Sequence, residues 1–128
     1  MSQVLEHSIN PIQWLSSAYS LLSFGGILLI AVPLYKGSYR FLGLKDPFII
    51  PPEHLNFFTK KSLRQAALNA GFRPVCSFSY SRIPYFNILH RFKAPLPSII
   101  AYRILQFIFW FLDRVGISMI QVQVFAKQ

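Results

Sequence analysis

Residues 10–33, NPIQWLSSAYSLLSFGGILLIAVP, constrain the fold more than any other stretch of the chain. Their first half predicts a helix. Asn10 is a residue type that caps helix N-termini, and Pro11 suits the first helical position, where its missing N–H costs nothing. Apolar side chains then recur at helical spacing on one face: Ile12, Leu15, Tyr19 and Leu22.

The second half of this stretch predicts a turn and a buried strand. Gly25-Gly26 ends the helix, and Ile27–Val32 is a continuous apolar run that Pro33 closes. A run of this length and composition is typical of a strand covered on both faces, as in a parallel sheet. Helix, glycine turn and buried strand in this order indicate an α/β fold.

Further downstream, the sequence predicts two helices and two strands. Thr59 is a good N-cap for a helix over Lys60–Ala70, and Gly71 suits the position just after the helix end. Alternating side chains predict strands over Pro74–Arg82 and Ile117–Lys127. An apolar run with periodic polar residues predicts the other helix, over Ile99–Leu112.

Together with Glu6-His7 and the later stretch PPEHLNFFTKKSL, these elements resemble a known family. The chain is similar to the C-terminal half of class I S-adenosylmethionine-dependent methyltransferases of the ubiquinone-biosynthesis-like type. The resemblance aligns Val4–His7 with the end of the fourth sheet strand, Pro11–Leu22 with the next helix and Ile27–Pro33 with the fifth strand. The resemblance covers most of the chain and is clearest up to about Phe72.

The resemblance implies an α/β fold with an incomplete Rossmann-like methyltransferase sheet. About three strands are expected, the last two antiparallel, together with helices and a helical insertion. The whole chain, 1–128, would be a single partial methyltransferase domain, and 83–115 would be the insertion, serving as a lid or as an interfacial helix. Because the first strands of such a sheet are missing, we expect an open strand edge that a partner chain could cover.

The cofactor that the resemblance implies is S-adenosyl-L-methionine. In this family a glycine-rich turn after the first strand lets the backbone approach the ligand, and an acidic residue after the next strand holds the ribose. This sequence has no such turn, since Gly25-Gly26 precedes a strand instead of following one. Cofactor contacts would come from Val4 and Leu5 at the strand end, and the chain alone is expected to be inactive.

The resemblance also assigns an acceptor site. Substrate contacts would come from four aromatic residues: Tyr35, Tyr39, Phe57 and Phe58. His54 is the candidate general base, because imidazole accepts a proton near neutral pH, and the loop that carries it lies by the pocket in the family. The alternative is that His54 serves only to hold its loop.

We expect no metal, with one alternative. Some related enzymes, including RNA 2′-O-methyltransferases that act on small-RNA ends, bind a divalent metal through a Glu-x-x-Glu-His run and a later histidine. Here Glu6, His7 and His54 match that pattern, but Gln3 stands in place of the first carboxylate. Since Mg²⁺ prefers carboxylate oxygens, this change weakens a magnesium site in particular.

Charge and hydrophobicity leave a second function class open. The net charge is +9 and 53% of the residues are hydrophobic. The basic residues form no long run and match no nucleic-acid motif, so we expect no nucleic-acid partner. The run Ile99–Leu112 is too short to span a bilayer, and basic residues surround it. A non-catalytic membrane-associated protein, anchored by residues 99–112, is therefore the alternative to methyl transfer to a small-molecule or lipid-linked acceptor. The expected location is cytoplasmic, with or without peripheral association at the inner membrane surface.

Because the glycine-rich turn and the ribose acid are missing, we expect this chain to bind S-adenosylmethionine weakly or not at all. Calorimetric titration of the 128-residue chain measures this directly. A dissociation constant in the low micromolar range would contradict the expectation.

Overall fold

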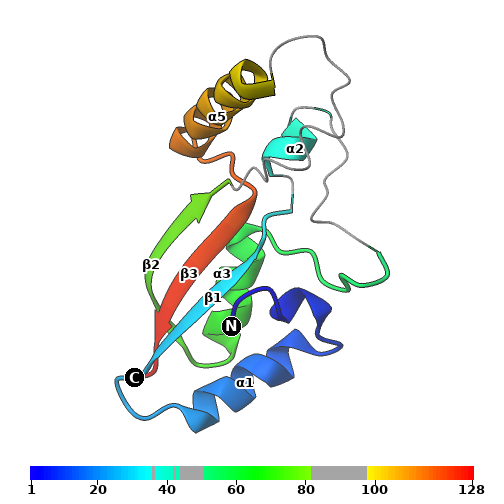
Figure 1. The fold of residues 1–128 in the computed structure, drawn as a ribbon. Coiled ribbons are helices and arrows are strands. Elements are labelled where there is room, and N and C mark those ends of the chain that lie inside the picture. The colour runs from blue at the N-terminus through cyan, green and yellow to red at the C-terminus, as the bar shows by residue number, and fades with distance from the viewer. Residues whose placement is uncertain (36, 42, 44–50, 82–97) are drawn as a thin grey trace.

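The computed structural model describes residues 1–35, 37–41, 43, 51–81 and 98–128. It has a three-stranded sheet in the order β1-β3-β2, with helices on both of its faces (Figure 1). The elements are η1 (Leu5–His7), α1 (Pro11–Leu21), β1 (Ile27–Pro33), α2 (Ser38–Phe41), α3 (Lys60–Asn69), β2 (Arg73–Tyr80), α5 (Ser98–Arg114) and β3 (Ile120–Ala126). The expected α/β class and the small, incomplete sheet are confirmed.

Both predicted helix starts are capped as the sequence indicates. The Asn10 side chain accepts a hydrogen bond from the backbone N–H of Gln13 at 3.1 Å. Thr59 and Ser62 form a reciprocal capping box at the start of α3. At the end of α3, Gly71 has a φ of 94°, in the left-handed region that favours glycine. Short-range capping chemistry therefore fixes where these helices begin and end.

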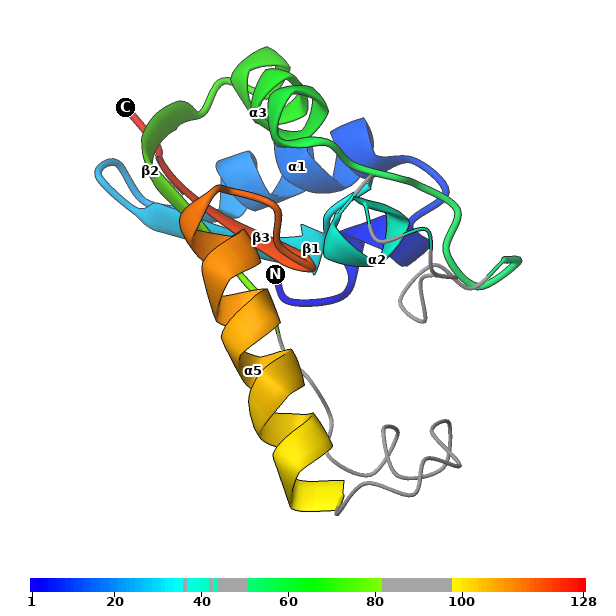
Figure 2. The same ribbon diagram turned by 90° about the horizontal axis from the view of Figure 1, so that it is seen from above.

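The three strands are paired through β3, which runs antiparallel to both neighbours. The predicted antiparallel arrangement of the last two strands is confirmed. Helices α1 and α3 cover one face of the sheet, and α5 lies on the other (Figure 2). The main core fills the α1/α3 side. Its largest fully buried side chains are Leu5, Leu15, Ile30, Leu63, Phe72 and Phe125.

The expectation that Val4–His7 ends a strand is wrong by a few residues, because Leu5–His7 form a 3₁₀ turn. The strand-like pairing comes earlier. The backbone N–H of Ala31 donates to Met1 O, and that of Gln3 donates to Ala31 O, both at 2.9 Å. Ser2 and Ala31 form a parallel bridge. The edge of β1 is thus partly covered by the chain's own first residues, and the expected open edge is smaller than predicted.

Strand β1 is also less covered than its apolar run suggests. Its residues on the α1/α3 face, Leu28, Ile30 and Val32, are buried. On the opposite face, Ile27 and Leu29 are 62% and 45% exposed. Only the C-terminal part of β1 is covered on both faces, because α5 packs there, against Ala31.

The predicted helix at 99–112 is present as α5. Residues 83–97 of the proposed insertion lie outside the described part of the chain. Within the described residues, no helix is long and apolar enough to cross a membrane.

Phe125→Ala should lower the free energy of unfolding by about 3–5 kcal/mol, because it removes a fully buried ring from the main core. The matched control is Phe78→Ala on β2, where the ring is 55% exposed and the loss should be much smaller. Chemical denaturation followed by circular dichroism measures both. Equal losses would mean that the core is not centred on Phe125.

Candidate functional site

Backbone hydrogen bonds join the two sequence segments that carry the candidate site. The carbonyl of Glu6 accepts from the backbone N–H groups of Leu55 and Asn56, at 2.8 and 2.9 Å. The Asn56 side chain adds a bond from Nδ2 to Ser8 O at 2.6 Å. These contacts span almost fifty residues of sequence. They hold the segment around Glu6 against the loop that contains His54.

Three side chains that could bind a proton or a metal converge at this junction. The ligand atoms of Glu6, His7 and His54 all lie within 4.8 Å of one another. The rings of His7 and His54 meet edge to face, with centroids 4.6 Å apart. Nε2 of His7 lies 4.0 Å from Oε1 of Glu6. The structure thus brings together the three residues that the sequence named as the alternative metal set.

Glu6 is the unusual member of this cluster. It is 1% exposed, and neither carboxylate oxygen has a hydrogen-bond partner among the described residues. Burying a carboxylate without a partner costs free energy, and such a group is typically paired or binds a metal. The arrangement therefore fits a bound cation beside Glu6.

The backbone orients His7 toward Glu6. Nδ1–H of His7 donates to the carbonyl oxygen of Glu53 at 2.8 Å. In the neutral imidazole, this hydrogen bond selects the tautomer whose Nε2 lone pair is on the side of Glu6. A histidine ligand is commonly fixed in this way by a second hydrogen bond. Two imidazoles and one carboxylate suit Zn²⁺ or Mn²⁺ better than Mg²⁺.

The four predicted substrate aromatics divide into different environments. The rings of Tyr35 and Phe57 lie together, with centroids 5.8 Å apart, and Phe57 is 42% exposed. Arg40, which the sequence analysis did not single out, lies over the Tyr35 ring at 5.4 Å. Phe58 is 7% exposed within the main core, which favours a structural role. Tyr39 belongs to α2, and its side chain lies outside the described part.

The two predicted cofactor contacts also differ. Val4 is 38% exposed and could contact a ligand with its side chain. Leu5 is fully buried in the main core. Its carbonyl oxygen accepts a hydrogen bond from Oγ of Ser8 at 2.8 Å, so this carbonyl is already bonded within the turn. Of the pair, Val4 offers the accessible surface.

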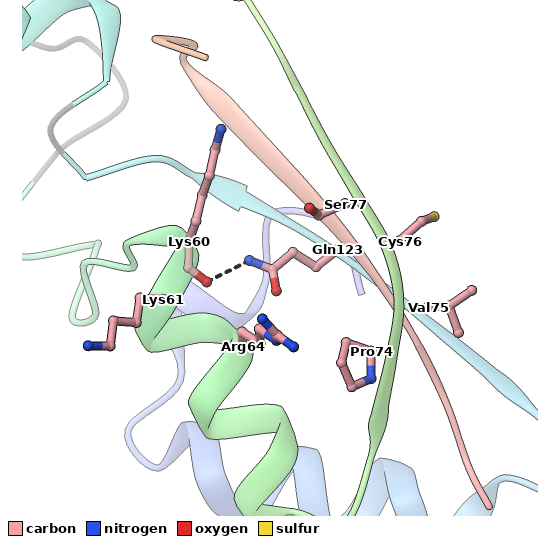
Figure 3. Close-up of a pocket in the computed structure, with 8 residues that line it drawn as sticks. All are labelled: Lys60, Lys61, Arg64, Pro74, Val75, Cys76, Ser77 and Gln123. Atoms are coloured by element: carbon pink, nitrogen blue, oxygen red, sulfur yellow. Dashed lines mark hydrogen bonds between the residues drawn. The ribbon is translucent and has the colours of Figure 1, made fainter.

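A cavity of about 430 Å³ lies elsewhere, between α3 and β2 (Figure 3). Its lining includes Lys60, Lys61, Arg64 and Gln123, and none of the predicted site residues. Gln123 reaches across to α3, where Nε2 donates to Lys60 O at 2.8 Å. This basic cavity was not predicted, because its residues come from segments far apart in sequence.

Comparison with known proteins decides the family. A family model described as "Methyltransferase domain" matches residues 1–77, which include the Glu6–His7–His54 cluster. The chain belongs to the methyltransferase domain family. The resemblance inferred from the sequence is thereby confirmed.

A solved structure shares the fold of this methyltransferase-family chain. It is a SAM-dependent methyltransferase from Archaeoglobus fulgidus, with a TM-score of 0.60 and 20% sequence identity. The alignment covers 99% of this chain and 57% of that one, so the chain spans little more than half the length of this relative. Among curated proteins, none matches the sequence significantly.

The cluster generates a prediction about divalent ions. If Glu6, His7 and His54 form a ligand set, Zn²⁺ or Mn²⁺ should raise the melting temperature of the chain more than Mg²⁺ does. Glu6→Gln should abolish this rise. Without metal, it should leave stability unchanged or raise it, because it removes a buried carboxylate that accepts no hydrogen bond from the described residues.

Glu53→Gln is the matched control, because Glu53 contributes only its backbone carbonyl to the cluster. This variant should keep the metal response. Thermal unfolding with each ion measures all three proteins. A metal response that survives Glu6→Gln would place the ion elsewhere.

Proposed function

We propose that this chain supplies the acceptor side of an S-adenosylmethionine-dependent methyl transfer to a small-molecule or lipid-linked acceptor. Membership of the methyltransferase domain family supports the reaction class. The observation that carries the acceptor-side role is the junction at Glu6 and His54. It gathers a buried carboxylate and two imidazoles next to a loop with an exposed aromatic residue, Phe57.

His54 is the proposed proton acceptor. When the acceptor is a hydroxyl, its oxygen forms a bond to the methyl carbon while the bond from that carbon to the sulfonium sulfur breaks. The hydroxyl proton then needs a base, and an imidazole serves this purpose near neutral pH. Glu6 and His7, which lie beside His54, would stabilise the positive charge that His54 gains or share its proton.

We propose that few of the described residues contact the cofactor. Bound S-adenosylmethionine would supply an already activated methyl group, so the protein chiefly has to position the acceptor. Val4 offers an exposed side chain for one cofactor contact. The acids described beyond Glu6 are Glu53 and Asp113, and Asp113 is engaged by Ser81. We therefore assign the main cofactor contacts to protein surface outside these residues.

The aromatic pair Tyr35 and Phe57 is the proposed contact for the acceptor's apolar part. Their rings lie 5.8 Å apart, and Arg40 stacks over Tyr35. A flat or long-chain apolar acceptor with a polar head matches such a surface. This favours hydrophobic acceptors, including lipid-linked ones, in the cytoplasm or at the inner membrane surface.

His54→Ala, in the complete methyltransferase domain, should lower turnover by about 10²–10⁴-fold while changing the acceptor's KM little, because a base acts only in the transition state. The loss should shrink at alkaline pH, where hydroxide shares the work. Transfer of labelled methyl groups from S-adenosylmethionine into extracted product measures turnover.

The control is Gln65→Ala, which alters an exposed residue of α3 outside the cluster and should leave turnover unchanged. An unchanged turnover in a folded His54→Ala protein would leave His54 with a structural role. It would also restrict the proposal to acceptors that need no base.

A further inference from the structure

Helix α5 carries an apolar stripe that remains exposed among the described residues of the chain. Exposed large apolar residues recur at helical spacing along it, at Ile100, Ile104, Phe107, Ile108 and Phe111, and Val115 continues the row just after the helix ends. This spacing places them on one face of the helix. Phe107 and Phe111 are 67% and 56% exposed. A continuous apolar face of this kind marks an interaction surface.

This stripe adjoins the face with which α5 packs on the sheet. Leu105, Phe109 and Leu112 lie on that neighbouring face, about a third of a turn around the helix, and belong to a second core cluster with Ala31 and Val122. The helix is therefore apolar on two faces: one is buried against the sheet, and the other faces outward. Figure 2 shows α5 projecting from the face opposite α1 and α3.

Arginines border the exposed stripe. Arg103 and Arg114 are both exposed, and Arg114 lies over the Trp110 ring at 5.1 Å. Trp110, itself 52% exposed, stacks on Phe107. Long arginine side chains beside aromatic rings are typical of helices at a membrane surface, where the charge reaches the headgroups and the rings enter the acyl boundary.

The charges around the helix favour an anionic surface. Asp113 is the one acidic residue of α5, and Ser81 occupies both of its carboxylate oxygens, at 2.9 and 2.6 Å. The net charge of the chain is +9. Basic residues near an anionic bilayer each add about 1 kcal/mol of attraction. The positive charge therefore favours an anionic membrane over a neutral protein surface as the partner of the exposed stripe.

We infer that α5 is an interfacial helix that docks the protein on anionic membranes, with the stripe from Ile100 to Val115 buried in the headgroup region. The helix has 17 residues and does not meet the requirements of a membrane span, so it lies on the bilayer instead of crossing it. The inference is independent of the proposed methyl transfer, because binding is measured without turnover.

The test is co-flotation of the full chain with vesicles. Vesicles that contain phosphatidylglycerol should carry the protein, and vesicles of phosphatidylcholine alone should carry much less. Phe107→Glu should weaken binding about tenfold or more, because it places a charge where a ring enters the bilayer. Since Phe107 is exposed, circular dichroism should show the fold intact.

Phe24→Glu is the matched control, since Phe24 is 86% exposed but lies outside α5, and its binding should be unchanged. Replacing both Arg103 and Arg114 by glutamate should remove the preference for anionic vesicles. Equal binding of the Phe107→Glu and native proteins would overturn the inference. Equal binding to both vesicle types would also overturn it. So would a native protein that does not float with vesicles but forms a dimer in light scattering, if Phe107→Glu dissociates that dimer.

Discussion

Two buried glutamines on β3 connect the sheet to the candidate site. Gln121 and Gln123 are 0% and 4% exposed. Their amide groups donate to Phe58 O and Lys60 O, and Gln123 also donates to Gln121. Because buried amides must find partners, these bonds fix the chain between the site loop and α3 against the central strand. The loop that presents His54 thus ends at a position set by the sheet.

Further hydrogen bonds connect this anchored segment to the rest of the site. The backbone of Leu34 and Tyr35 lies beside Phe58, with Tyr35 N donating to Phe58 O at 2.8 Å. The loop before Phe58 is bonded in turn to Glu6 and Ser8. A site built on backbone bonds keeps its geometry while side chains vary, which suits a fold that can host different functions.

The parts of the structure that the sequence predicted are those with local causes. The Asn10 and Thr59 caps and the turn at Gly71 depend on neighbours a few residues away. The family resemblance placed His54 near Glu6, but the distances between them depend on bonds between residues 6–8 and 53–56, which no periodicity reveals. Phe58 was expected to contact substrate, yet tertiary packing buries it. The sequence likewise did not predict which face of α5 points outward, since helical spacing alone does not tell which of two apolar faces meets the sheet.

The strand order has a consequence for how the chain acquires its structure. β3 lies between β1 and β2 but follows both in the sequence. On the ribosome, the two earlier strands therefore have no β3 to pair with until residues 120–126 emerge. The apolar strand 27–33 therefore has no β3 partner while almost ninety further residues are synthesised, and chaperones can bind it during this time. The sheet forms only when β3 pairs with β1 and β2 at the end of synthesis. These long-range pairings predict slow folding compared with a helical chain of this size.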